Sequence, residues 1–210
     1  MSDLSETVAR VALTASAAGT AAPEIPAVPV VPVRVGRLAR LLAMDEQLLV
    51  AATRFQGPWR TRLARGLTRA GDASSWTLAV LAFLAAGGAL VRPGIRMGAA
   101  ALLATTLSQV LKRRLNRPRP TSAIDGFRAL ADNPDAFSFP SGHTAAAFAV
   151  AVALAGAPFG LGPAALILAL GIGASRVYLG AHYPLDVGAG AALGMVAGGA
   201  GRLVVTALGG

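Results

Sequence analysis

The sequence of 210 residues contains no cysteine, and charged residues make up only 14% of it. The absence of cysteine excludes disulfide bonds, thiol nucleophiles and thiolate metal ligands. Soluble domains carry about 25% charged residues, so this scarcity of charge, together with 54% hydrophobic residues, favours a membrane protein. Histidine is scarce as well, because His143 and His182 are the only two in the chain.

Acidic residues are outnumbered by basic ones, which leaves a net charge of +9. Nearly all of the basic charge is arginine, and Lys112 is the single lysine. A basic chain can bind nucleic acid, but the apolar composition favours anionic lipid head groups or phosphate as partners. We therefore expect membrane lipids and no nucleic acid as partners, and the sequence does not indicate an oligomeric state.

The first 35 residues do not have a helical pattern, because prolines recur every third residue between 23 and 32. We predict a disordered or extended tail at 1–35 and one membrane domain at 36–210. The alternative for residues 11–33 is a poor transmembrane or transit segment.

Two segments near the start of the domain are typical of helices that lie beside a bilayer. Residues 37–55 place several leucines on one stripe, while Asp45 and Glu46 rule out a lipid-spanning centre. Residues 59–69 combine Trp59 and two leucines with four arginines, which predicts a basic interfacial helix on lipid head groups. A solvated helix face is the alternative for this second segment.

Five apolar segments follow, and they predict an all-α membrane bundle of about five transmembrane helices. They cover residues 75–91, 97–111, 143–157, 161–175 and 186–207. We expect the first break between them at Arg92-Pro93-Gly94. Several segments are shorter than the roughly 20 residues that span a bilayer, so polar turns complete the crossing or the core is shielded from lipid. The glycines at 190, 194 and 198 predict close helix packing.

Counting crossings places three polar clusters on the same face of this bundle. The first cluster contains Lys112 and Arg119-Pro120, the second is Pro140-Ser141-Gly142-His143, and the third runs from Ser175-Arg176 to Asp186. Only three arginines, Arg92, Arg96 and Arg202, fall near the opposite face. The excess of arginine beside the clusters favours a cytoplasmic position for them.

The clusters contain the groups that cleavage of a phosphate ester requires. Ser141 and Gly142 open a helix whose free N–H groups suit an anion, and His143 could there protonate a leaving group. Asp186 lies one turn after His182 and could orient its ring, which leaves the other nitrogen free to attack phosphorus. Arg119 and Arg176 can each make bidentate hydrogen bonds to phosphate oxygens, and Lys112 adds a point charge. Each motif alone is weak evidence for this chemistry, but the occurrence of all three in this order is specific evidence for it.

These residues give the chain a close resemblance to the type 2 phosphatidic acid phosphatase superfamily. The family pattern is Lys, six residues, Arg-Pro; then Pro-Ser-Gly-His; then Ser-Arg, five residues, His, three residues, Asp, and this sequence matches all of it. The resemblance covers roughly residues 60–205.

The resemblance implies an integral enzyme of a bacterial-type plasma membrane that hydrolyses a lipid phosphomonoester or diphosphate without metal or cofactor. It implies a phosphohistidine intermediate on His182, oriented by Asp186, with His143 as general acid. The implied phosphate ligands are Lys112, Arg119, Ser141, Gly142 and Arg176. Candidate lipids are polyprenyl diphosphates or phosphate sugars, phosphatidate and phosphatidylglycerophosphate. The alternatives are an enzyme like the vanadium-dependent haloperoxidases of the same superfamily, or a non-catalytic lipid-binding protein.

The loop 121–139 links the first two clusters. We expect it to lie over the site through Phe127 and Phe137, and its aspartates to discourage additional anionic groups on the substrate. These aspartates are Asp125, Asp132 and Asp135.

Overall fold

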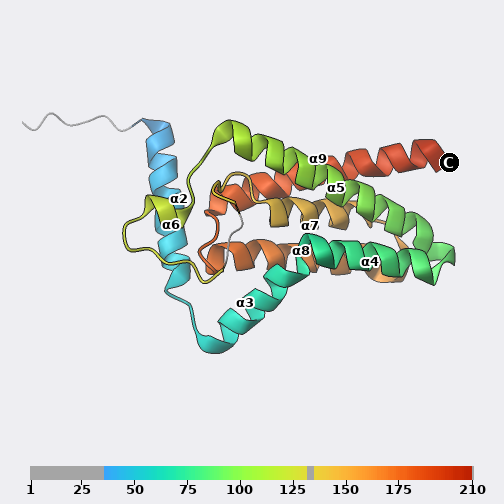
Figure 1. Ribbon diagram of the computed structural model, residues 1–210, viewed down its shortest axis with the longest axis horizontal. Helices are drawn as coiled ribbons and strands as arrows, with labels where there is room; N and C mark the ends of the chain where they lie inside the picture. Colours follow the sequence, from blue (N-terminus) through green and yellow to red (C-terminus); the bar gives the residue numbers. More distant parts are fainter. Residues whose placement is uncertain (1–35, 132–134, 210) are drawn as a thin grey trace, which may run out of the picture. The chain divides into compact units, whose positions relative to one another are not determined.

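The computed structural model describes residues 36–131 and 135–209, and this part of the chain is all-α (Figure 1). The predicted tail at 1–35 lies outside the described residues. The helices are α2 (Arg37–Thr53), α3 (Pro58–Ala70), α4 (Ala73–Ala86), α5 (Val91–Leu115), α6 (Pro120–Ala123), α7 (Gly142–Ala153), α8 (Leu161–Tyr178) and α9 (Pro184–Gly209), with short 3-10 turns η1 (Gly88–Leu90) and η2 (Pro158–Gly160). Within the described ranges, β-structure is limited to one isolated bridge between Pro118 and Phe137.

The five apolar segments form helices α4, α5, α7, α8 and α9, which confirms the predicted all-α bundle. Three stretches are long and apolar enough to cross a membrane, namely Gly88–Leu115, Pro158–Tyr178 and Pro184–Leu208. The other two helices, α4 and α7, have only 14 and 12 residues. At about 1.5 Å per residue they fall short of a hydrocarbon core of about 30 Å.

Helix α7 is the centre of the bundle, and this position explains its shortness. It packs against α5, α8 and α9, and Figure 1 shows it running among them. No residue of α7 is exposed, and its inward positions are mostly alanine. Alanine lets neighbouring backbones approach closely, as small residues do in membrane helix interfaces. The bundle core around α7 is therefore shielded from lipid by the longer helices.

The glycine repeat on α9 serves this packing, as expected. A Cβ atom added at Gly190, Gly194 or Gly198 would lie 2.6, 2.3 or 2.6 Å from a backbone carbonyl oxygen of Ser141 or α7. Real Cβ atoms essentially never come within 3.0 Å of such an atom. The three glycines therefore let α9 lie directly on the backbone of α7.

The break expected at Arg92-Pro93-Gly94 is wrong, because these residues lie in the first turn of α5. The chain turns earlier, at Gly87 and Gly88, whose φ angles are +70° and +53°. Glycine adopts such angles without steric penalty. Pro93 is tolerated because N–H groups of a first helical turn lack intrahelical acceptors, so its missing donor costs nothing there.

Helix α2 forms as predicted but with an unexpected inner face. Its leucines at 38, 41, 42 and 48 are exposed, whereas Asp45 and Leu49 are buried. Figure 1 shows α2 running across the ends of the bundle helices. A helix that buries a carboxylate and exposes leucines is suited to a place between protein and lipid.

The packing of α9 on α7 predicts opposite effects for two glycines of α9. Gly194→Ala should lower the free energy of unfolding by about 1–3 kcal/mol, because its Cβ must displace the α7 backbone. Gly199→Ala should leave stability unchanged or raise it, since no atom lies within 4 Å of its added Cβ. Thermal unfolding of both variants in the same detergent measures the difference, and equal melting temperatures would contradict this account of the packing.

Candidate active site

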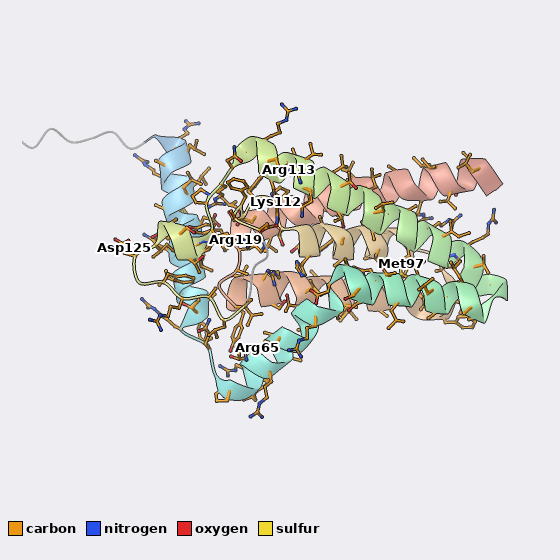
Figure 2. All side chains as sticks on the ribbon, viewed as in Figure 1. Arg65, Met97, Lys112, Arg113, Arg119 and Asp125 are labelled. Atoms are coloured by element: carbon orange, nitrogen blue, oxygen red, sulfur yellow. The ribbon has the colours of Figure 1, made fainter. Side chains whose placement is uncertain are left out.

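The three motifs meet at one end of the bundle because of where each helix begins or ends. Lys112 lies in the last turn of α5, His143 in the first turn of α7, Arg176 in the last turn of α8, and His182 just before α9. Figure 2 shows Lys112 and Arg119 together at this end. They border a cavity of about 280 Å³, which we call the inner cavity. Its lining consists of Gly71, Asp72, Ala73, Trp76, Thr105, Gln109, Lys112, Arg119, Asp135, Gly142, His143, Ala146, Arg176 and His182.

Three cations of the inner cavity are almost completely buried. Lys112, Arg119 and Arg176 are only 4%, 4% and 2% exposed. Arg119 Nη1 donates a hydrogen bond of 2.7 Å to the carbonyl of Ala181. Arg176 Nη1 donates one of 2.5 Å to Thr68 Oγ1. These bonds hold the guanidinium groups in fixed orientations, as recognition of a phosphate requires.

Asp135 supplies the anion that pairs with two of these cations. Lys112 Nζ donates to Asp135 Oδ2 at 2.5 Å, and Arg119 Nη2 donates to Oδ1. Arg119 Nε also donates to the backbone oxygen of Asp135 at 2.8 Å. Burial alone would raise the pKa of Asp135, but the hydrogen bonds from Lys112 and Arg119 hold the pKa below its ordinary value. The carboxylate is therefore ionised, and it occupies a site built for an oxyanion.

His182 lies beside these cations and is 1% exposed. Burial, and then Arg176 and Arg119, lower its pKa well below the ordinary value, so the ring is neutral at pH 7. Nε2 lies 3.4 Å from Arg119 Nη1. Nδ1 lies 3.6 Å from Asp186 Oδ2, which is ion-pair range but longer than a hydrogen bond. The structure thus brings the expected pair together without closing the hydrogen bond between them.

His143 faces a partner that the sequence analysis did not identify. Its Nε2 lies 2.9 Å from Asp72 Oδ1. Asp72 stands at the N-cap position of α4, yet its side chain makes no capping bond there. Burial and the charge of Arg176 lower the pKa of His143 below its ordinary value. The carboxylate of Asp72 opposes this by stabilising the protonated imidazole, which is the form a general acid needs. Sequence signals mark Asp72 only as a helix start, so its link to His143 required the fold.

Two of the expected residues, Ser141 and Asp186, are fully buried and do not line the inner cavity. Ser141 is the N-cap of α7, and its Oγ accepts a hydrogen bond of 2.9 Å from Thr144 Oγ1. Its backbone N–H donates to the carbonyl of Asp186 at 3.0 Å, which ties the second motif to the third. Gly142 does line the cavity. The remaining expected residues thus surround the cavity, and these two brace it from behind.

A second cavity of about 620 Å³ adjoins the first, and we call it the outer cavity. It shares Asp72, His143 and Arg176 with the inner cavity. Its other lining residues are Arg65, Thr68 and Arg69 of α3 and Ala129, Leu130 and Ala131 of the loop before α7. Sequence analysis assigned the α3 arginines to lipid head groups, but two of them face this cavity. The described part of the loop borders both cavities, and Asp132 lies outside the described residues.

Comparisons with known proteins agree with the motifs. The family model described as the PAP2 superfamily matches residues 93–208. A decaprenylphosphoryl-5-phosphoribose phosphatase of Mycobacterium tuberculosis is 36% identical over 146 residues, which cover 67% of this chain and 78% of that protein.

Two solved structures share the fold. One is a transmembrane PAP2 type phosphatidylglycerolphosphate phosphatase of Bacillus subtilis, with a TM-score of 0.65, 28% identity, and coverage of 80% of this chain and 86% of that one. The other is LpxE of Aquifex aeolicus, with a TM-score of 0.66, 26% identity, and coverage of 75% and 94%. The chain belongs to the PAP2 superfamily and is a membrane lipid phosphatase of that family.

Proposed function

We propose that this phosphatase uses His182 as nucleophile and His143 as general acid, on a lipid whose head group carries a second anionic group beside the phosphate that is removed. The observation that carries the proposal is the meeting of both imidazoles and three buried cations around the inner cavity. The outer cavity, which opens beside His143, supports the part of the proposal that concerns the head group.

The first chemical step is attack by the neutral ring of His182. Its Nε2 forms a bond to phosphorus while the bond from phosphorus to the leaving oxygen breaks, and His143 gives that oxygen a proton. Water then attacks the phosphohistidine, His143 takes a proton from the water, and inorganic phosphate leaves. Lys112, Arg119 and Arg176 stabilise the charge on the equatorial oxygens throughout. Ser141 and Asp186 keep the first turn of α7 and the nucleophile in place.

Asp135 acts as an internal competitor in this scheme. Its carboxylate already bonds Lys112 and Arg119, which are two of the proposed phosphate ligands. A substrate phosphate has to displace it, and only a ligand with more charge or more oxygens than a carboxylate gains from the exchange. The expectation that the loop aspartates discourage anionic groups therefore has a specific candidate in Asp135.

The substrate class follows from the arginines beyond the reacting centre. Arg65 and Arg69 add two positive charges to the outer cavity, close to His143 on the leaving-group side. A phosphatidate head group ends at its single phosphate and would leave these charges unused. A polyprenyl lipid joined through a phosphodiester to a phosphorylated sugar would place its second anion there. The named Mycobacterium tuberculosis relative acts on a lipid of this kind, decaprenylphosphoryl-5-phosphoribose.

We further propose that the site faces the cytoplasm from the plasma membrane of a bacterial-type cell. The support is the distribution of arginine, which is dense on α2, α3 and the end of α5, whereas Arg92, Arg96 and Arg202 lie toward the other end of the bundle.

The two imidazoles should differ in what their removal does. His182→Ala should abolish release of inorganic phosphate from every substrate, because the nucleophile is gone. His143→Ala should slow alkyl phosphates by about 10²–10⁴-fold and aryl phosphates much less, since a good leaving group needs no proton. Phosphate release by the purified variants in detergent measures both effects. Activity that survives in His182→Ala would refute the mechanism, because another group would then have to be the nucleophile.

Neutralising the internal competitor should tighten anion binding. Asp135→Asn should lower the inhibition constant of orthovanadate by about five- to tenfold, which corresponds to about 1–1.4 kcal/mol of binding free energy. Asp125→Asn is the matched control, because Asp125 lies in the same loop and is exposed. Inhibition assays at fixed ionic strength make the comparison. Weaker inhibition of Asp135→Asn than of the control would mean that Asp135 helps to hold the anion.

The α3 arginines should determine selectivity and not rate. Arg65→Gln combined with Arg69→Gln should raise KM for a polyprenylphosphoryl sugar phosphate about tenfold and leave KM for phosphatidate unchanged. The control is Arg62→Gln, which removes an exposed α3 charge that does not line the outer cavity. Kinetics with the two lipids in mixed micelles give the ratio. An equal loss with both lipids would assign these arginines to the membrane surface.

A further inference from the structure

Helix α2 contains a buried carboxylate with no place in the proposed chemistry. Asp45 is 2% exposed, although Leu41, Leu42 and Leu48 beside it on α2 are exposed. A carboxylate is buried at a high free-energy cost unless hydrogen bonds and an opposite charge offset it. Its neighbour Glu46 shows the ordinary alternative, because that side chain is exposed. The partners of Asp45 therefore indicate its role.

One partner of Asp45 is the start of α9. Asp45 Oδ1 accepts a hydrogen bond of 2.8 Å from the backbone N–H of Leu185. The first N–H groups of a helix have no partner within that helix, so a carboxylate from another helix can cap it. The first turn of α9 contains Asp186 and directly follows His182. Asp45 thus fixes the backbone that positions the proposed nucleophile and its orienting carboxylate.

The other partner of Asp45 is Arg117, which also binds Asp186. Arg117 Nη2 donates to Asp45 Oδ2 and Nη1 donates to Asp186 Oδ1, each at 2.7 Å. The guanidinium carbon lies 4.1 Å from the centre of the Tyr183 ring, within the range of a cation–π contact. A planar guanidinium can bridge two carboxylates in this way, whereas a lysine ammonium lacks the fork geometry.

The bridge determines which oxygen of Asp186 is left for His182. Oδ1 of Asp186 is bound by Arg117, and Oδ2 accepts from the N–H of Tyr183 at 2.9 Å and faces His182 Nδ1. The carboxylate cannot rotate without losing a charged hydrogen bond. A continuous chain of contacts therefore runs from α2 to the nucleophile, in the order Asp45, Arg117, Asp186, His182.

We propose that Asp45 and Arg117 are positioning residues of the catalytic centre, and that α2 is a structural part of the active site. The proposal rests on the proposed function, because it takes His182 as nucleophile. Neither residue lines the inner cavity, so they act through Asp186 and not on the substrate. Loss of the Arg117 bridge should reduce the rate of phosphoryl transfer. It should leave phosphate binding by Lys112, Arg119 and Arg176 intact.

The test separates the charge of Asp45 from its capping role. Asp45→Asn keeps an oxygen for the N–H of Leu185 but removes the ion pair with Arg117. We expect kcat to fall at least tenfold, while KM and the inhibition constant of inorganic phosphate stay within about twofold. Glu46→Gln removes the adjacent, exposed carboxylate of α2 and should keep full activity. A wild-type kcat in Asp45→Asn would overturn the proposal, as would a loss that is matched by weaker phosphate inhibition.

A second variant keeps the proposal falsifiable if Asp45→Asn does not fold. Arg117→Lys retains the positive charge but not the two-sided bridge, so it should show the same fall in kcat with unchanged phosphate inhibition. Normal turnover in Arg117→Lys would also overturn the proposal. His182→Ala distinguishes the two levels of inference. If that variant is inactive while Asp45→Asn and Arg117→Lys are normal, only the positioning role fails, whereas an active His182→Ala removes the proposed function itself.

Discussion

Lys112, Arg119 and Arg176 are buried together at the end of an apolar bundle, and such a cluster is stable only with an anion between its members. Like charges at close range in a poorly solvated place repel strongly, and each loses its hydration. In the described chain, Asp135 offsets part of this cost through two ion pairs, and the carbonyl of Ala181 and the hydroxyl of Thr68 add hydrogen bonds. In the proposed function, a phosphoryl group with more charge offsets more of this cost, so relief of the repulsion among the three cations would contribute to the affinity for the substrate.

The same constraint accounts for the neutral state of His182, the proposed nucleophile. A histidine among three cations resists protonation, and the burial of His182 adds to that resistance. The site therefore keeps the ring in the form that can attack phosphorus without needing a base to deprotonate it. Burial and the charge of Arg176 lower the pKa of His143 as well, but the carboxylate of Asp72, 2.9 Å away, partly opposes this by favouring the protonated form. The two imidazoles therefore differ in their carboxylate partners, because Asp72 lies at hydrogen-bond distance from His143 whereas Asp186 Oδ2 lies 3.6 Å from His182 Nδ1.

Sequence analysis predicted the parts of this arrangement that are local in the chain. The apolar segments, the two helices before them and the glycine stripe were recognisable because hydrophobic periodicity and composition reflect what a single helix contacts. The position of the three motifs on one face of the bundle followed from counting how many predicted helices separate them. Asp45, Asp72 and Arg117 were not predicted as site residues, because each meets its partner across 69 to 140 residues of chain. Contacts between residues so far apart in the chain leave no periodic pattern in the sequence. An isolated aspartate in a sequence is equally consistent with a helix cap or a solvated surface.

Helix α2 shows why a correct secondary-structure prediction can still miss a role. Its leucine stripe indicated contact with the membrane, and the exposed positions of those leucines agree with that interpretation. Asp45 served in the sequence only to exclude a lipid-spanning centre, whereas in the fold it is buried against the start of α9. Lipid would contact one face of α2, while the other face reaches Asp186 through Arg117. An amphipathic helix so placed would connect the bilayer to the proposed nucleophile through the guanidinium of Arg117, so a shift of α2 would alter the contacts of Asp186.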